Sequence, residues 1–327
     1  MTRIITAAVA SMLLSLLVGS RFIGWLRRNE IGQFIREEGP EGHRVKAGTP
    51  TMGGLLIVAS FVVPFLILSD RSAASMTVLF AALGCAGIGL LDDYTKVVQR
   101  RSLGLKGVTK FALLLLIALF VSFVAVAFVG TRGAIDLPFV ETSLKLGLVY
   151  VLLTYFVVAG TSNAVNLTDG LDGLAAGSVA IALVAYVAIC FTTPGARDLA
   201  ILSSALAGSC VGFLWFNTHP ADVFMGDTGS LALGGALAGL AVMTQTEVVL
   251  IVIGGLFVIE ALSVMIQVAW FKRFGQRVFL MTPIHHHFEM KGWTETKIIV
   301  RLWIAAAACA AIGFAIYYRD RGGLPIA

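Results

Sequence analysis

The sequence predicts an all-α, polytopic membrane protein, and two observations carry that prediction. Hydrophobic residues make up 58% of the 327 residues and charged residues only 13%, with a mean hydropathy of +0.90, whereas soluble domains carry about 25% charged residues. Apolar runs of roughly 20 residues, the length of helix that crosses the hydrocarbon core of a bilayer, recur along the whole chain. We therefore expect one integral membrane domain covering residues 1–327.

Taken in order, the apolar runs predict about ten transmembrane helices. The first is too long for a signal peptide, and Arg27 and Arg28 follow it as a cytoplasmic stop. The eighth is short and glycine-rich, and the loop 130–145 has room for a short hairpin. The predicted spans are 4–26, 52–69, 73–91, 108–129, 146–165, 174–192, 199–216, 230–244, 248–271 and 298–318.

The loops between these spans differ in their content of Lys and Arg, which are enriched in cytoplasmic loops. Three loops on one side carry five, five and six of the 24 cations, and the opposite side carries seven, with Arg21 left inside the first span. This asymmetry predicts that both termini are extracytoplasmic and that five loops are cytoplasmic. The net charge of +5 then belongs to the inner surface, where it suits anionic lipids or phosphorylated substrates and does not indicate nucleic-acid binding.

Two inner loops are acidic although the inner side is otherwise basic. They contain the stretches NLTDGLDG and NTHPADVFMGDTGS, which have no Lys or Arg. Ionisable groups beside membrane segments are costly and point to function. Asp169, Asp172 and Asp227 each precede a span, however, so helix capping is an equally good explanation for any one of them.

The pair Asp92 and Asp93 in LLDDYTK does not fit the capping explanation. It closes the third span at a helix C-terminus, where the helix dipole disfavours anions, so a cation should compensate it. Lys96, one turn further on, is one candidate for an ion pair. The other is Mg²⁺, which takes oxygen ligands from one or two carboxylates and completes its shell with water and phosphate oxygens.

Three further inner stretches add candidate site residues. The Thr and Pro of KAGTPTMGG favour the start of a helix there, and Lys46 beside them is a candidate phosphate contact. TPIHHHFEMKGW holds three consecutive histidines inside a long inner loop, which favours phosphate or metal chemistry. In the ninth span Glu260, Ser263 and Gln267 form a polar stripe on one helical face, which we expect to face protein or a cavity.

These stretches, together with NAVNLTDGLDGLA and FNTHPADVFMGDTGSLALGG, resemble the phospho-N-acetylmuramoyl-pentapeptide transferase family in order and spacing. The resemblance covers nearly the whole chain. The aspartate motifs are shared across the wider superfamily of polyprenyl-phosphate N-acetylhexosamine 1-phosphate transferases, and the triple-histidine stretch resembles this particular branch.

The resemblance implies a Mg²⁺-dependent enzyme of the bacterial inner (cytoplasmic) membrane, with its active-site cleft on the cytoplasmic face. Such an enzyme transfers phospho-N-acetylmuramoyl-pentapeptide from its UDP-linked donor to undecaprenyl phosphate, forming lipid I in peptidoglycan synthesis and releasing UMP. Its partners would be these two substrates and the lipid bilayer, with no nucleic acid, and a homodimer is compatible with this interpretation.

The same resemblance assigns residues to roles. Asp227 would bind Mg²⁺, Asp92 would act as the base or orienter for the lipid phosphate, and Asp93 would belong to the same charge network. His285 would contact phosphate or assist catalysis, with His286 and His287 shaping its loop. The remaining substrate-binding residues would be the phosphate-holding Lys46, Lys96 and Lys110 and the nucleotide-pocket residues Asn166, Asp169, Asp172, Asn217, Phe224 and Gln267.

Two alternatives stay open at this point. A sister transferase that uses UDP-N-acetylglucosamine would share the aspartate motifs. A secondary transporter would also place ionisable groups in glycine-interrupted helices, but it would have them near mid-membrane and in two related halves. Here all but Glu260 lie at the inner ends of the spans, and no internal repeat is evident.

Overall fold

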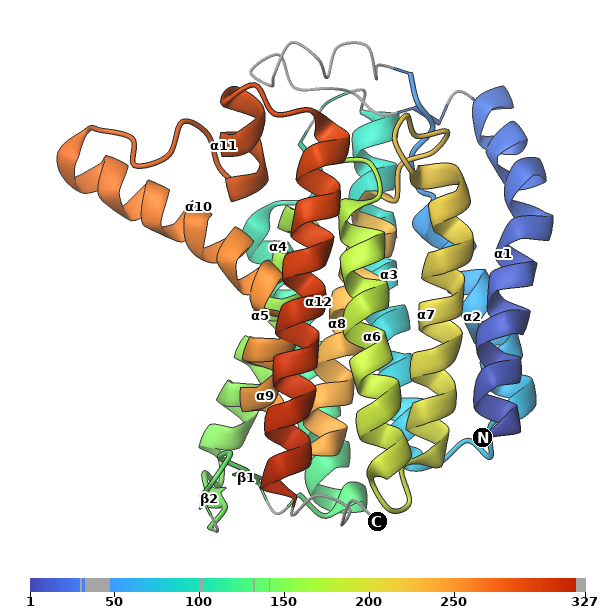
Figure 1. The fold of residues 1–327 in the computed structure, drawn as a ribbon, viewed down its shortest axis with the longest axis vertical. Coiled ribbons are helices and arrows are strands. Elements are labelled where there is room, and N and C mark those ends of the chain that lie inside the picture. Colours follow the sequence, from blue (N-terminus) through green and yellow to red (C-terminus); the bar gives the residue numbers. More distant parts are fainter. Residues whose placement is uncertain are drawn as a thin grey trace.

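The computed structural model describes residues 1–29, 31–32, 48–99, 101, 103–131, 133–140 and 142–321. Within them the chain is almost entirely helical (Figure 1). The helices are α1 (Thr2–Arg28), α2 (Gly54–Leu68), α3 (Ala73–Val98), α4 (Gly107–Val124), α5 (Val149–Thr168), α6 (Leu174–Thr192), α7 (Arg197–Asn217), α8 (Gly226–Thr244), α9 (Glu247–Ile253), α10 (Gly255–Phe274), α11 (Ile284–Met290) and α12 (Glu295–Asp320), with a π-helical turn η2 (Ala125–Val129) continuing α4.

The prediction of an all-α membrane protein is confirmed. Eight helical segments of the described chain are long and apolar enough to cross a membrane: α1, α3, α4 with η2, α5, α6, α7, α10 and α12. Two of the ten predicted spans fall outside this group, since α2 is apolar but has only 15 residues and α8 is the glycine-rich helix. All ten runs are nevertheless helical, and many apolar side chains on the outer faces are exposed, as expected of surfaces that meet lipid.

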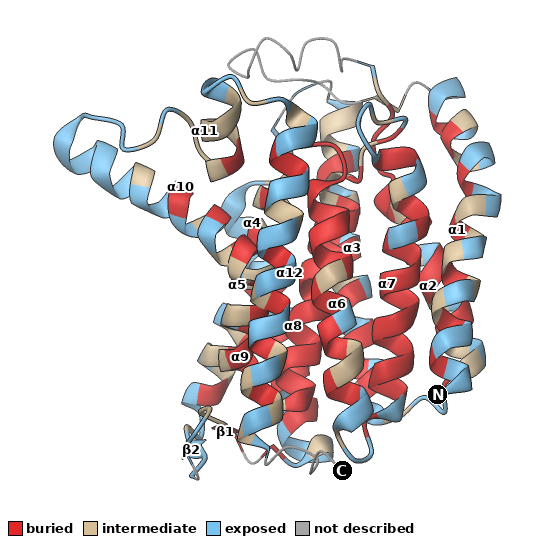
Figure 2. Ribbon diagram, in the orientation of Figure 1, coloured by how far each residue is buried: buried red, intermediate tan, exposed pale blue. Residues whose placement is uncertain are grey.

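Helix α8 lies at the centre of the bundle, which explains its composition. Every residue from Thr228 to Thr244 is buried (Figure 2). A Cβ built on Gly234 would lie 2.5 Å from the Cα of Ser162 in α5, so a larger residue would force the two helices apart. Small residues let helices approach closely where apolar burial alone gives no advantage over lipid. The weak hydropathy of this run therefore reflects its position inside the protein.

The ninth predicted span is not one continuous helix. It is divided at Gly254, which ends α9 and begins α10. Adjacent glycines are a usual site for a sharp change of helix direction, and Gly255 also lies close to α12, where an added Cβ would be 2.7 Å from the Cys309 sulfur. Beyond this break α10 leaves the bundle and projects sideways with mostly exposed side chains (Figures 1 and 2).

The two ends of the bundle are unlike each other. At the upper end in Figure 1, α3, α5 and α7 finish and α6, α8 and α12 begin, with α11 beside them; we call this the site end. The start of α1 and the end of α12 lie at the opposite end, together with the predicted hairpin, which pairs β1 (Ala134–Ile135) antiparallel with β2 (Leu144–Lys145). The extracytoplasmic placement of both termini stays a prediction.

Candidate active site

Five charged side chains at the site end form one ion-pair cluster, in which Asp93 lies at the edge, 3.7 Å from Lys96 Nζ. Lys96 Nζ lies 2.7 Å from Asp92 Oδ2 and 2.9 Å from Asp227 Oδ1. Lys110 Nζ lies 3.0 Å from Asp92 Oδ1 and 2.7 Å from Asp227 Oδ2. Each lysine thus bridges the same two carboxylates, and the cationic partner expected for the aspartate pair of α3 is present twice.

Local structure explains how Asp92 enters this cluster. Helix α3 continues to Val98, beyond the predicted end of the third span, so Asp92 and Lys96 lie one helical turn apart on the same face. The chain after α3 folds back over the carboxylate, and the Leu105 N–H donates to Asp92 Oδ1 at 2.6 Å. Gly104 makes this approach feasible, because a Cβ there would lie 2.3 Å from the carboxylate. Asp92 is fully buried as a result.

Asp93 has a different function from its neighbour. Its Oδ1 accepts a hydrogen bond from the Asp227 N–H at 3.1 Å, and its Oδ2 accepts from the Thr228 N–H at 2.9 Å and the Thr228 hydroxyl at 2.7 Å. These N–H groups belong to the first turn of α8, whose donors have no partner within the helix. Asp93 therefore caps α8 from another helix and fixes the position of Asp227.

The three carboxylates fit a divalent metal ion in donor type and charge. Asp92, Asp93 and Asp227 each offer an oxygen within 4.8 Å of the others, and oxygen donors are what Mg²⁺ prefers. With two ammonium groups and three carboxylates, the cluster has a formal net charge of −1. Asp227 is the most available ligand, because Asp92 and Asp93 are buried and both Asp93 oxygens accept backbone hydrogen bonds, whereas the Asp227 side chain is 14% exposed.

Capping does not explain the loop aspartates. Neither α6 nor α8 has a side-chain hydrogen bond at its N-cap, and Asp169 stands at the C-terminal end of α5. Burial, together with the charges of Asp227, Asp93 and Asp172, raises the pKa of Asp169 to about 8. Near neutral pH Asp169 is therefore mostly the neutral acid, because a further charge is disfavoured beside the carboxylates of the cluster.

His285 is the member of the triple-histidine stretch that is fully buried. The stretch forms α11, and His285 Nδ1 lies 3.0 Å from Oε2 of Glu260, which is also fully buried, in α10. On its other side the ring meets Gly170 in the loop between α5 and α6, where a Cβ would lie 2.3 Å from His285 Nε2. The structure thus places the histidine stretch against the loop that carries Asp169 and Asp172.

The other two histidines and Gln267 hold the neighbouring backbone. His286 Nδ1 contacts Glu289, and His287 Nδ1 accepts from the Leu280 N–H at 3.1 Å. Partial burial and the charge of Lys291 keep the pKa of His287 below its usual range, which agrees with its role as an acceptor. Gln267 accepts from the Val278 and Phe279 N–H groups and donates to the Phe279 carbonyl, so in this structure it supports the loop after α10.

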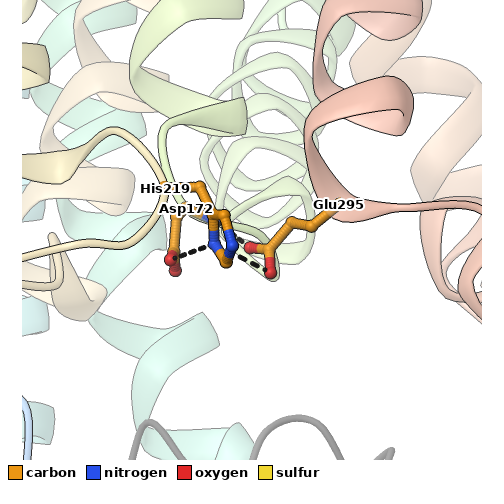
Figure 3. Close-up of side chains that lie close together, drawn as sticks. All are labelled: Asp172, His219 and Glu295. Atoms are coloured by element: carbon orange, nitrogen blue, oxygen red, sulfur yellow. Dashed lines mark hydrogen bonds and ion pairs between the residues drawn. The ribbon is translucent and has the colours of Figure 1, made fainter.

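Asp172 belongs to a second polar cluster that the sequence did not reveal (Figure 3). His219 Nδ1 lies 3.0 Å from Asp172 Oδ2 and 3.2 Å from Glu295 Oε2, and the Asp172 N–H donates to Glu295 Oε1 at 2.9 Å. The cluster ties the α5–α6 and α7–α8 loops to the start of α12. Among the predicted residues, Asn217 supports it by accepting from the Gly173 N–H at 3.0 Å. His219 lies in one of the acidic stretches quoted above, but nothing in the local sequence of Glu295 indicates this contact.

The remaining predicted site residues lie at the site end or outside the described residues. Asn166 donates to the Ser230 hydroxyl at 2.8 Å, next to the first turn of α8. Phe224 is partly exposed and is held by backbone hydrogen bonds to Pro50 and Gly53. Lys46 lies outside the described residues.

Comparison with known proteins places this arrangement in a family. The family model described as Glycosyl transferase family 4 matches residues 75–245, and signature 1 of phospho-N-acetylmuramoyl-pentapeptide-transferase matches residues 46–58. Phospho-N-acetylmuramoyl-pentapeptide-transferases of Rubrobacter xylanophilus and Anoxybacillus flavithermus are 48% and 47% identical to the chain, covering 97% and 96% of it and 98% and 97% of their own lengths. That of Desulfitobacterium hafniense is 44% identical, covering 96% of the chain and 98% of its own. The chain therefore belongs to the phospho-N-acetylmuramoyl-pentapeptide-transferase family.

Proposed function

We propose that this enzyme transfers phospho-N-acetylmuramoyl-pentapeptide from its UDP-linked donor to undecaprenyl phosphate at the inner face of the bacterial cytoplasmic membrane. A terminal oxygen of the lipid phosphate attacks the sugar-bound phosphorus of the donor. The bond from that phosphorus to the bridging diphosphate oxygen breaks, and UMP leaves with this oxygen. The product is lipid I. The observation that carries the proposal is the double bridge of Lys96 and Lys110 between Asp92 and Asp227, which gathers cations and a metal-competent carboxylate at one point.

Three groups of the cluster have separate tasks in this reaction. Asp227, with Asp92 as a second carboxylate nearby, would hold Mg²⁺, and the bound ion would offset the charge of the diphosphate. Lys96 and Lys110, with side chains 28% and 20% exposed, turn toward incoming phosphate oxygens when the substrates replace their carboxylate contacts. Asp92, buried and bonded to the Leu105 N–H, orients the two lysines, and Asp93 keeps Asp227 in place through α8.

The nucleotide and the polyprenyl chain need different environments, one polar and one apolar. We place the nucleotide at the acidic loop with Asp169, where Asn166 and Phe224 are partly exposed, whereas Asp172 and Asn217 are buried and hold this loop in position. The polyprenyl chain stays in the apolar phase, because the reacting phosphate needs only to reach the site end of the bundle.

A direct assay tests the proposal. Purified protein in lipid or detergent is given radiolabelled UDP-N-acetylmuramoyl-pentapeptide and undecaprenyl phosphate, and label in butanol-extractable lipid is measured with and without a chelator. We expect label in the lipid phase that depends on Mg²⁺. A parallel reaction uses UDP-N-acetylglucosamine, and faster transfer from that donor would contradict the assigned substrate while leaving the reaction type intact.

A further inference from the structure

The pair formed by Glu260 and His285 is the least expected feature of the site end. Both side chains have an exposed fraction of 0%, and they come from α10 and α11. Glu260 Oε2 lies 3.0 Å from His285 Nδ1 and 3.5 Å from the His285 backbone N–H. One carboxylate oxygen thus contacts both the ring and the first turn of α11, which fixes the position and the rotation of the imidazole.

A carboxylate next to one ring nitrogen decides where the proton of a neutral imidazole sits. Glu260 Oε2 already accepts from the His285 backbone N–H, so it acts as an acceptor, and the Nδ1 that faces it must carry the proton while Nε2 keeps its lone pair. Within the described residues Nε2 is buried without a hydrogen-bond partner. Burying an acceptor without a partner costs about 1–3 kcal/mol. Nε2 without a partner therefore destabilises the folded protein unless a ligand binds to it.

Nε2 points at the substrate-binding loop. A Cβ on Gly170 would lie 2.3 Å from it, so only glycine allows the ring to take this position. Among the described residues, His286 also lies against the ring, with its ring centroid 4.1 Å away, and Asp169 and Asp172 belong to the same loop as Gly170. The lone pair is therefore aimed at the loop where we place the UDP-linked donor.

We propose that Glu260 is a positioning residue for His285: it holds the imidazole as the Nδ1–H tautomer and reserves the Nε2 lone pair for the donor substrate, which reaches it when the Gly170 loop that covers Nε2 in this structure moves aside. This inference rests on the proposed role of His285 at the donor phosphates. When Nε2 takes a proton from water, which leaves hydroxide in the bulk solvent, or from a protonated substrate phosphate, the ring becomes a donor to a phosphate oxygen, and the Glu260 carboxylate stabilises the resulting positive charge. Glu260 acts only through the histidine and does not itself touch substrate.

The experiment measures the tautomer directly. The chain has five histidines, so ¹⁵N-histidine labelling of the full-length protein in lipid gives a short set of ring-nitrogen signals, and the His285→Asn variant identifies those of His285. We expect wild-type His285 to be the Nδ1–H tautomer. In Glu260→Leu it should change to Nε2–H, the form an isolated imidazole prefers, and turnover should fall at least about tenfold. Glu260→Gln, which presents either an amide oxygen or an NH₂ to Nδ1, should give a mixture of tautomers and an intermediate turnover.

Ser263→Ala is the matched control. Ser263 lies on the same face of α10 and is also buried, and within the described part of the chain its hydroxyl bonds only the Glu260 carbonyl, so its loss should change neither the tautomer nor turnover. The inference is overturned if wild-type His285 carries its proton on Nε2, or if turnover falls in the Glu260 variants while the tautomer stays the same, since that result means a packing role. If Glu260→Leu does not fold, Glu260→Gln answers both points alone. Full turnover in His285→Asn would refute the proposed role of the histidine, whereas the tautomer measurements judge Glu260 separately.

Discussion

Asp92 and Glu247 are both buried carboxyl groups, but they lie at opposite ends of the bundle and have different partners. Asp92 at the site end is paired with two ammonium groups, 2.7 and 3.0 Å away. Glu247, at the start of α9, is 5% exposed and its Oε1 accepts from the Tyr150 hydroxyl at 3.2 Å. A carboxyl group bonded to a hydroxyl can be buried as the neutral acid, whereas the ion-pair cluster keeps formal charges out of water.

Keeping formal charges buried is expensive and brings little stability. The cost of removing two ions from water often equals or exceeds their attraction, so a buried ion pair is weak evidence for a stabilising role. Charges are retained at the site end, on this account, because the chemistry of diphosphates and Mg²⁺ requires them. The opposite end has no such requirement: buried Glu247 is bonded to a hydroxyl group there, and buried Asp198 to the backbone N–H groups of Asp70 and Ser72. Substitutions at the two ends should therefore affect different properties of the enzyme.

The largest effect is expected from removing the charge of the most accessible carboxylate. Asp227→Asn should reduce turnover by at least about 10²-fold, the scale seen when one strong electrostatic group is lost from an active site. Transfer of radiolabel at a series of Mg²⁺ concentrations measures it, with size-exclusion chromatography as the check on folding. Near-normal turnover with an unchanged Mg²⁺ dependence would remove Asp227 from the metal site.

A smaller effect should follow loss of either lysine. Lys96→Gln and Lys110→Gln each leave Asp92 and Asp227 with one cation instead of two, and we expect about a tenfold loss in kcat/KM for the UDP-linked donor, from a charge-assisted hydrogen bond of roughly 1.5 kcal/mol. Initial rates at varied donor concentration show whether the loss comes from a higher KM or from a lower kcat. Lys291→Gln, in the loop after α11, is the charge-matched control, and an equal loss there would mean that only net charge matters.

The third prediction concerns pH and stability at the acidic loop. Because the folded-state pKa of Asp169 is raised to about 8 from its usual value near 3.8, the protonated group favours the folded state at low pH, and that contribution is lost as pH rises through about 8. With a chelator present, the Tm of the wild type should fall between pH 6 and 9 by a few degrees more than that of Asp169→Asn. Differential scanning fluorimetry on the two proteins checks this, and parallel curves would show that Asp169 does not titrate in this range.

The smallest effect should come from the opposite end. Glu247→Gln keeps a side chain that can accept from the Tyr150 hydroxyl, so turnover should stay within about twofold of wild type and Tm should change by only a few degrees. The same radiolabel assay and thermal scan apply. A loss of turnover comparable to that of Asp227→Asn would mean that the two ends are coupled and that the contrast drawn here between them is wrong.

Much of the candidate site could be predicted because charged residues in an apolar chain are conspicuous. Asp92, Asp93, Lys96 and Lys110 stand out at the ends of apolar runs, and the structure brings all four together with Asp227. The capping explanation for Asp227 was a reasonable alternative from sequence, since the residue does lie in the first turn of a helix. It failed because the cap of α8 comes from Asp93 on another helix, and no local pattern encodes such a contact.

The sequence by itself determined that this is a membrane protein, where its helices lie along the chain and which kinds of charge its site holds. Apolar run length and residue type are local properties. Only the tertiary structure decided which charges meet. Lys96 and Lys110 contact Asp227 across 131 and 117 residues of chain, and Glu260 in α10 contacts His285 in the separate helix α11. Such pairings depend on how helices pack, and packing in a membrane is governed by close fits of small residues such as Gly234 rather than by hydrophobicity.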